Sequence, residues 1–263
     1  MSGLKFNFSD KLVFVAGGSS GINLGIADAF IQAGARVAIF SRSEERVAAA
    51  VQFLQRDGAQ ALGLTGDVRD ASAVAAALEA TATRWGPIDV VVSGAAGNFV
   101  APALNISPNG FKSVVDIDLL GTFNVLRAAH PWLRKPGASL INISAPQALV
   151  AMPMQAHVCA AKAGVDMLTK VLAMEWGPEG IRVNSIVPGP IDGTEGMRRL
   201  TPTEADRRTV EGAVPLRRFG TVEAVAGAAL MLSSSLGDYI TGVVLPVDGG
   251  ASLAGPGLFS PRP

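Results

Sequence analysis

Short apolar runs alternate with longer amphipathic stretches along almost the whole chain, and this alternation constrains the fold more than any other feature. Because strands that alternate with helices build βαβ units with right-handed crossovers, the pattern predicts an α/β fold with a doubly wound parallel sheet. The predicted strands are Leu12–Ala16, Arg36–Phe40, Ala61–Thr65, Val90–Ser93, Ser139–Ser144, Arg182–Val187 and Val243–Val247. The predicted helices cover residues 22–34, 43–57, 71–85, 106–134, 155–178 and 221–233.

The length of 263 residues fits one domain, so we expect residues 1–263 to form a single Rossmann-like unit. Hydrophobic residues make up 49% of the chain, which suits a sheet that helices cover on both faces. Residues 190–217 depart from the pattern, because Pro190, Gly193 and Pro202 stand there among charged residues without a strand. We expect a helical flap over the active site, and an ordinary surface excursion is the alternative.

Charge and cysteine content exclude several classes of function. Lys plus Arg and Asp plus Glu number 22 each, so no global field favours nucleic acid or an anionic membrane. The single cysteine, Cys159, allows no internal disulfide, and no Cys/His cluster predicts a metal site. The first residues lack the apolar core of a signal peptide, and Ser260–Pro263 is not a Ser-Lys-Leu-type address. We therefore expect a cytoplasmic protein without a membrane span.

A glycine-rich turn follows the first predicted strand, where the chain reads Gly17-Gly18-Ser19-Ser20-Gly21-Ile22-Asn23 and then opens a helix. Glycines let the backbone approach a pyrophosphate, and the helix N-terminus offers free N–H groups to it. The hydroxyls of Ser19 and Ser20 add donors at the same place. The position of this turn at a strand-to-helix junction favours a dinucleotide site over a plain tight turn.

The end of the second strand predicts which dinucleotide is bound. An acidic residue there would hydrogen-bond a ribose 2′-hydroxyl and repel a 2′-phosphate. Ser41 and Arg42 occupy this position instead, and a guanidinium is the natural bidentate partner of a phosphate. We expect NADP(H) as the cofactor, and a solvated surface arginine is the alternative interpretation of Arg42.

The segment Ala16–Asn23 resembles the Thr-Gly-x-x-x-Gly-x-Gly motif of the short-chain dehydrogenase/reductase family, from which Ala16 and Asn23 depart. Asn23 replaces the glycine that lets helix and strand pack closely. Ser93-Gly94-Ala95-Ala96-Gly97 resembles the family's Asn-Asn-Ala-Gly segment, altered at its first two positions. The resemblance implies further cofactor contacts at Asp67, Val68 and Ala95 near the adenosine, and at Lys162, Pro188, Gly189, Ile191 and Thr194 near the nicotinamide.

The usual catalytic motif of that family is incomplete. Most members carry a Ser followed by Tyr-x-x-x-Lys, in which the Tyr delivers a proton to a carbonyl oxygen. Ser144 and Lys162 are present, but Val158 stands four residues before Lys162 and cannot transfer a proton. His157 is adjacent, but one residue along a helix turns a side chain by about 100°. We therefore expect His157 to be a helix-surface or substrate-contacting residue, not a replacement acid.

Asp118 marks a second departure from the family. The family usually has Asn three residues before the glycine that corresponds to Gly121. A carboxylate beside a nicotinamide can orient a water molecule and relay a proton. The alternative is a structural Asp118 that caps the following helix.

Together these departures resemble one subgroup, the 2,4-dienoyl-CoA reductases, and most closely the peroxisomal type. The segments that carry this resemblance are Ala95–Phe99, Pro108–Asp118, Gly121–Asn124, Glu175–Pro178 and Pro188–Gly196. The mitochondrial type uses a Tyr upstream of the Lys, and Gln147 stands at the matching position here. What remains is the peroxisomal-type arrangement of an Asp with an ordered water.

The resemblance implies that NADPH gives hydride to C5 of a 2,4-dienoyl-CoA and that the α-carbon then takes a proton, leaving a 3-enoyl-CoA. Asp118, acting through water, is the implied proton donor, and Lys162 positions the ribose. Ser144, Asn98 or a backbone N–H stabilises the developing oxyanion. Asn98, Phe99 and His157 are the candidate substrate contacts.

Partners and rival functions complete these expectations. Arg198, Arg199, Arg207 and Arg208 either meet the phosphates of the acyl-CoA or form a solvated helix face. The resemblance implies a homotetramer packed through the helices over 106–134 and 155–178. One rival function is another short-chain oxidoreductase, such as a 2-enoyl-thioester reductase or a carbonyl reductase with a relocated acid. The other is a catalytically weak NADP-binding regulator, which the departures at Val158, Ala16 and Asn23 suggest.

Overall fold

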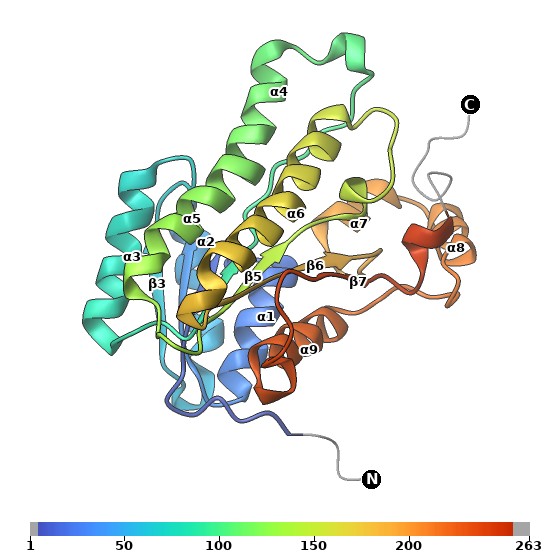
Figure 1. The fold of residues 1–263 in the computed structure, drawn as a ribbon. Helices are drawn as coiled ribbons and strands as arrows, with labels where there is room; N and C mark the ends of the chain where they lie inside the picture. Colours follow the sequence, from blue (N-terminus) through green and yellow to red (C-terminus); the bar gives the residue numbers. More distant parts are fainter. Residues whose placement is uncertain (1–4, 255–263) are drawn as a thin grey trace.

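Seven parallel strands form one sheet in the order β3-β2-β1-β4-β5-β6-β7 in the computed structural model, which describes residues 5–254 (Figure 1). Residues 1–4 and the Ser260–Pro263 tail, on which the targeting expectations rested, lie outside the described residues. The order in which successive strands are added reverses beside β1, because β1 pairs in parallel with β2 on one side and with β4 on the other. The strands are β1 (Leu12–Ala16), β2 (Arg36–Ser41), β3 (Ala61–Thr65), β4 (Val90–Ser93), β5 (Ser139–Ile143), β6 (Arg182–Pro188) and β7 (Val244–Val247).

Helices cover both faces of the sheet, as the apolar runs predict. The helices are α1 (Gly21–Gln32), α2 (Glu44–Leu54), α3 (Ala71–Trp85), α4 (Pro108–Val115), α5 (Gly121–Ala129), α6 (Ala156–Trp176), α7 (Glu195–Leu200), α8 (Glu204–Ala213) and α9 (Val222–Ser233). One core joins α1, α2 and α9 to the sheet, and the other joins α3, α5 and α6 to its opposite face. Val13 and Val15 of β1 belong to the first core, and Leu12 and Phe14 belong to the second. This alternation explains why the strand is apolar at every position.

The doubly wound parallel sheet is confirmed, and the predicted strands agree with the observed ones to within one residue at each end. Six of the helices begin where a side chain accepts a backbone N–H: Ser43 at α2, Asp70 at α3, Ser107 at α4, Thr194 at α7, Thr203 at α8 and Thr221 at α9. These residues are the usual N-caps, so the starts of the helices can be understood from the sequence.

The prediction of one uninterrupted helix over residues 106–134 is wrong. A π-helical turn, Asp116–Leu120, separates α4 from α5, and a 3₁₀ turn follows at His130–Trp132. The turn contains neither Pro nor Gly, so the sequence does not mark the interruption. Such turns occur frequently at functional sites, and this one contains Asp118.

Residues 190–217 are helical and contain no strand, as predicted. They carry α7 and α8, and an isolated bridge joins Ile191 to Gly220 beyond them. α8 begins with a capping box in which the side chains and backbones of Thr203 and Asp206 bond reciprocally. Because this segment leaves β6 at its carboxyl end, it lies at the same edge of the sheet as the glycine-rich turn. None of the helices within residues 5–254 is both long and apolar enough to cross a membrane.

Candidate active site

The glycine-rich turn brings two loops into close contact at the carboxyl ends of β1 and β4. Gly17 and Gly21 have φ angles of 78° and 57°, in the left-handed region that favours glycine. A Cβ atom on Gly17 would lie 2.8 Å from the backbone nitrogen of Ala95. Ser20 is the N-cap of α1 but its side chain makes no capping hydrogen bond, so the first N–H groups of the helix stay available to an anion.

A cavity of about 290 Å³ opens beside this turn. It extends from the turn along the ends of β2, β3 and β4, as expected for a ligand at the switch point of a doubly wound sheet. Eight of the predicted cofactor residues line it: Gly17, Ser19, Ser20, Ser41, Arg42, Asp67, Val68 and Ala95. The predicted contacts Gly21, Ile22, Lys162, Pro188, Gly189, Ile191 and Thr194 are not among its lining residues.

Two arginines line the outer end of the cavity, although the sequence analysis identified only Arg42. Arg46, in the first turn of α2, is the other. Ser19 Oγ donates to Ser41 Oγ at 2.9 Å, which fixes the hydroxyl of Ser41 beside the turn. The side chain of Arg69 forms a two-pronged pair with Asp67 and holds the pKa of that carboxyl below its usual value. The charge of Arg42 acts on Asp67 in the same direction.

Asn23 ties the glycine-rich turn to the end of β4. Its Nδ2 donates to the carbonyl of Gly94 at 2.7 Å and to that of Gly17 at 3.4 Å. A Cβ atom on Gly94 would collide with the Asn23 side chain. The departures at positions 23 and 94 therefore belong together: an amide at one position requires a glycine at the other.

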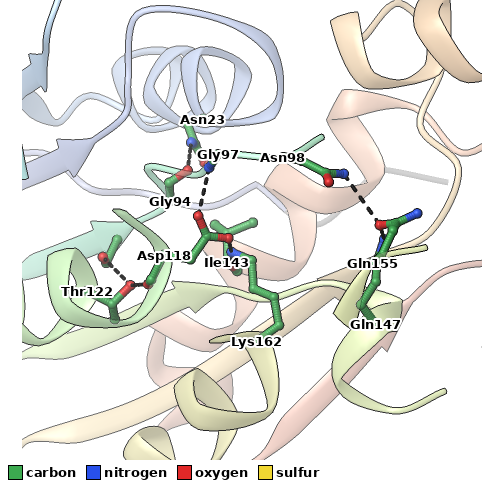
Figure 2. A network of polar contacts seen from close by, with 11 residues as sticks. Asn23, Gly94, Gly97, Asn98, Asp118, Thr122, Ile143, Gln147, Gln155 and Lys162 are labelled. Carbon is green, nitrogen blue, oxygen red and sulfur yellow. Dashed lines mark hydrogen bonds and ion pairs between the residues drawn. The ribbon is translucent and has the colours of Figure 1, made fainter. Parts of the chain in front are cut away.

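Asp118 and Lys162 meet in the interior, as Figure 2 shows. Asp118 Oδ1 accepts the backbone N–H of Gly97 at 2.7 Å, and Oδ2 lies 3.3 Å from Lys162 Nζ. Lys162 Nζ also donates to the carbonyl of Ile143 at 3.0 Å. Both side chains are almost fully buried. The Asp118 side chain caps no N–H of α5, whose N-cap is Leu120, so the capping alternative is wrong.

An apolar residue, Val158, stands where most members of the family carry the proton-donating Tyr. Val158 is buried and packs with Val114 and Ala161. His157 is fully buried, so its interpretation as a helix-surface residue is wrong. Its ring lies 4.2 Å from that of Phe99, centroid to centroid, and burial lowers its pKa. Within residues 5–254, neither of its ring nitrogens has a hydrogen-bond partner.

A chain of three amides crosses the site near these rings (Figure 2). Asn98 Nδ2 donates to Gln155 Oε1 at 3.5 Å, and Gln147 Nε2 donates to the same oxygen at 2.8 Å. Gln147, which the sequence matched to the mitochondrial-type tyrosine, thus donates an amide N–H to Gln155. The sequence analysis did not single out Gln155, because an isolated Gln before a helix carries no signal of its own.

Ser144 and the cluster behind it complete the interior of the site. Ser144 follows β5, and its Oγ is buried without a hydrogen-bond partner in the described part of the chain. Asp166, on α6, accepts the hydroxyl of Ser185 at 2.8 Å. Burial raises the pKa of Asp166, against the opposing effect of the hydroxyls of Ser144 and Ser185. Asp166 was not predicted as a site residue, because a single Asp on an amphipathic helix usually faces solvent.

Apart from Lys162 on α6, the predicted nicotinamide contacts lie at the end of β6 or in the residues that follow it. Gly189 leaves no room for a side chain, because a Cβ atom there would lie 2.5 Å from the Cα of Asp248. Thr194 is the N-cap of α7; its hydroxyl accepts the N–H of Met197 and donates to the carbonyl of Ile191 at 2.8 Å. Pro188 is the last residue of β6.

Most of the flap arginines have local partners. Arg198 and Arg199 pair with Glu195, and Arg207 pairs with Asp192 and stacks on the ring of Phe219. No group of three or more His, Cys, Asp or Glu side chains suited to a metal ion occurs between residues 5 and 254.

Comparison with known proteins connects this geometry to an enzyme family. The family model described as enoyl-(acyl carrier protein) reductase matches residues 16–252. A peroxisomal 2,4-dienoyl-CoA reductase, (3E)-enoyl-CoA-producing, from Rattus norvegicus is 45% identical over 244 residues, which is 92% of this chain and 84% of the relative. The enzyme of the same name from Arabidopsis thaliana is 44% identical over 256 residues, with 94% of this chain and 86% of the relative covered.

Solved structures agree with the sequence relatives. A short-chain type dehydrogenase/reductase from Mycobacterium ulcerans superposes with a TM-score of 0.90 at 32% identity, covering 94% of this chain and 92% of the other. A short chain dehydrogenase from Bacillus anthracis superposes with a TM-score of 0.82 at 38% identity, covering 92% and 96%.

Proposed function

Because this chain belongs to the short-chain dehydrogenase/reductase family, we propose that its site reduces a 2,4-dienoyl-CoA to a 3-enoyl-CoA with NADPH. The chain is an oxidoreductase by family, and relatives at 44–45% identity are named for this reduction. The observation that carries the proposal is the buried pair of Asp118 and Lys162, 3.3 Å apart, beside a Val158 that can give no proton.

The residues at the carboxyl edge fit a dinucleotide. Gly17 lets the glycine-rich turn pack directly against the backbone of Gly94 and Ala95, and the uncapped N–H groups at the start of α1 are available to a pyrophosphate. Arg42 and Arg46 line the cavity, and neither forms an ion pair with a carboxylate within residues 5–254, which favours the 2′-phosphate of NADP(H). When bound, the cofactor supplies the hydride; the protein residues bind, orient and move the proton.

Hydride addition at C5 moves electrons through the diene to the thioester oxygen, so a donor must stabilise that oxygen. Ser144 suits this role, because its buried hydroxyl has no partner in residues 5–254. Asn98 fits less well, because its amide already donates to Gln155. Lys162 adds positive charge near the thioester oxygen and binds the nicotinamide ribose, as in the family.

Proton delivery to the α-carbon falls to a water molecule held by Asp118. Gly97 N–H occupies Oδ1, and Oδ2 makes no hydrogen bond within the described residues, so it can accept one from water. The pairing with Lys162 and the π-turn hold this carboxylate in one orientation. His157, neutral and packed against Phe99, serves as a wall for the acyl chain.

The proposal is tested by steady-state oxidation of NADPH with a panel of acyl-CoA thioesters. We expect turnover with 2,4-hexadienoyl-CoA and none with saturated acyl-CoA. A carbonyl reductase would instead turn over 3-ketoacyl-CoA, which Val158 disfavours by removing the acid. A non-enzymatic regulator would bind NADPH and oxidise none of it with any substrate.

Assembly and location belong to the same proposal. Exposed apolar side chains gather on α5 and α6, the helices through which we propose a homotetramer to pack; they are Phe123, Met167, Val171 and Met174. The proposed partners are thus an acyl-CoA and further copies of the chain, with no nucleic acid and no membrane. We propose a cytoplasmic location, whereas the relatives are named peroxisomal. We propose that Arg208 binds the phosphates of the acyl-CoA, because Arg198, Arg199 and Arg207 already pair with carboxylates.

A further inference from the structure

Asn23 is a buried amide that joins two loops of the site. It is the third residue of α1, is 8% exposed and lies at the wall of the cavity. Its Nδ2 donates to the carbonyl of Gly94 at 2.7 Å and to the carbonyl of Gly17 at 3.4 Å. Within residues 5–254 no other group donates to either carbonyl. Both carbonyls therefore depend on one side chain for a hydrogen-bond partner.

The segment Gly94–Gly97, which Asn23 binds at its first residue, lies between the glycine-rich turn and the π-helical turn. On one side, a Cβ atom on Gly17 would lie 2.8 Å from the backbone nitrogen of Ala95. On the other side, a Cβ atom on Gly97 would lie 3.0 Å from Ile117 Cδ1. The first three residues of the segment also line the cavity. The segment is thus closely packed on both sides and borders the proposed cofactor site.

The last residue of the same segment binds the carboxylate that the proposed mechanism uses. Gly97 N–H donates to Asp118 Oδ1 at 2.7 Å, and Figure 2 shows Asn23 and Asp118 at the two ends of the segment. Four residues span at most about 14 Å even when fully extended. Because the segment is short and bound at both ends, a shift at Gly94 is passed on to the N–H of Gly97.

The backbone of Asp118 is held by a separate set of hydrogen bonds. Thr122 Oγ1 donates to the carbonyl of Asp118 at 2.7 Å, and Ser93 Oγ donates to Thr122 Oγ1 at 3.3 Å. All three residues are buried. These bonds do not involve Asn23, so we expect the π-helical turn to keep its place when Asn23 is replaced. The effect of Asn23 then reaches Asp118 at its carboxylate.

We infer that Asn23 is a positioning residue, whose amide holds Gly94–Gly97 and thereby directs the Asp118 carboxylate for proton delivery. Lys162 contacts Oδ2 alone, so Oδ1 is directed by the N–H of Gly97. Asn23 stands where the family motif has Gly, and Gly94 stands where it has Asn, so this chain carries the amide on the opposite side of the same contact. The inference rests on the proposed function, because proton delivery by Asp118 belongs to that proposal.

The first test compares Asn23→Ala in two backgrounds, with 2,4-hexadienoyl-CoA and saturating NADPH. We expect kcat to fall about ten- to a hundredfold, because a small displacement of a catalytic group is costly. The dissociation constant of NADPH should rise less, by about two- to tenfold, since the substitution removes hydrogen bonds within the protein. In an Asp118→Asn background, Asn23→Ala should change kcat by less than about twofold, because the group that Asn23 positions is already disabled.

Two further variants separate the amide from its volume and its position. Asn23→Leu keeps the shape of the side chain but has no donor, so it should lose about as much kcat as Asn23→Ala. Asn7→Ala is the matched control, because that surface amide accepts only the N–H of Ser9 and should keep wild-type turnover. If Asn23→Ala does not fold, Asn23→Gly, which carries the residue of the family motif, takes its place.

Failure of the inference and failure of the proposed function give different results. If the wild type does not turn over 2,4-hexadienoyl-CoA, the proposed function fails and the positioning role fails with it. If the wild type is active, the inference alone is overturned by wild-type kcat in Asn23→Leu, or by an Asn23→Ala loss of equal size with and without Asp118. Thermal unfolding and fluorescence titration of NADPH show that each variant is folded and binds the cofactor.

Discussion

Lys162 Nζ lies 3.3 Å from Asp118 Oδ2, so a lysine in the middle of α6 and an aspartate in a π-helical turn form an ion pair inside the protein. Both side chains are at most 6% exposed. Charges that are this deeply buried are stable only when each has its partner, because desolvation of an unpaired ion costs several kcal/mol. The pair therefore couples the proposed proton-relaying carboxylate to the residue that would hold the nicotinamide ribose.

Asp118→Asn is expected to lower kcat for 2,4-hexadienoyl-CoA by about 10²–10⁴-fold, the usual contribution of a general acid. The asparagine can still accept the N–H of Gly97, so NADPH affinity should be largely kept. Asp116→Asn is the matched control, because Asp116 pairs with Lys112 at the surface and should be nearly silent. Near-wild-type turnover by Asp118→Asn, with chemistry rate-limiting, would mean that the proton comes from another group.

Arg42→Ala is expected to weaken NADPH binding by about ten- to a hundredfold, because a hydrogen bond to a charged group contributes about 1.5–3 kcal/mol. NADH affinity should hardly change, since NADH has no 2′-phosphate. Arg46→Ala should act in the same direction, because Arg46 lines the same end of the cavity. Arg56→Ala is the control, since that arginine pairs with Asp28 elsewhere. Equal dissociation constants for the two cofactors in the wild-type protein would refute the NADP(H) preference.

The fold could be predicted almost entirely from the sequence, because a parallel sheet buried on both faces leaves a periodic signal. Alternate residues of β1 lie in the two cores on opposite faces of the sheet, and for this reason every residue of the strand is apolar. The glycine-rich turn could also be predicted from the sequence, because a glycine is needed where Gly17 approaches the backbone of Ala95. The prediction of one continuous helix over 106–134 was wrong because a π-helical turn interrupts it at Asp116–Leu120, where the sequence contains neither Pro nor Gly to mark a break.

The interior of the site was less predictable, because burial decides it and single polar residues carry no periodic signal. Asp166 looks like an ordinary polar position of α6, and only the packing against β6 places its carboxyl beside Ser185. His157 was expected at the helix surface or against substrate, but its side chain is fully buried and packs against Phe99, from a distant loop. Tertiary contacts of this kind are not present in the local sequence.

Asn23 and Gly94 are expected to be energetically coupled. Gly94→Ala should destabilise the protein, because the new Cβ atom would collide with the Asn23 side chain. In an Asn23→Gly background the collision is gone, so the same substitution should cost about 0.5–3 kcal/mol less. The four proteins of this cycle are compared by denaturant unfolding. Strict additivity of the two free-energy changes would show that the residues do not interact.

His157→Leu is expected to stabilise the protein and to impair turnover. Both ring nitrogens lack partners within residues 5–254, and an unsatisfied buried polar group costs about 1–3 kcal/mol. A leucine at this position fills the space beside Phe99 without that cost, but it changes the wall of the proposed acyl site. Gln155→Leu is the contrast, because it leaves the amide of Gln147 without its acceptor and should destabilise. Thermal unfolding and kcat/KM are measured for both; a destabilised His157→Leu would contradict the argument.

The pH dependence of stability offers a test of Asp166 that does not depend on activity. Its folded-state pKa is raised, chiefly by burial, so the folded protein holds this proton more tightly than the unfolded chain. The corresponding stability is fully present below the unfolded value near 3.8 and is lost as pH rises through the folded-state pKa. Asp166→Asn cannot ionise, so its free energy of unfolding should gain on the wild type over that window, by about 1.4 kcal/mol for each unit of pKa elevation.

Asp192→Asn provides the control of opposite sign in the same experiment. The guanidinium of Arg207 lowers the pKa of Asp192, so the stability from this pair is present above the unfolded pKa and is lost as pH falls through the folded one. The gap between Asp192→Asn and the wild type should therefore shrink toward acid pH, whereas the Asp166→Asn advantage should grow toward alkaline pH. Urea unfolding at a series of pH values measures both differences, and it removes any pH-independent effect of either substitution. An Asp166→Asn difference that is flat with pH would show that the buried carboxyl does not hold its proton in the folded protein.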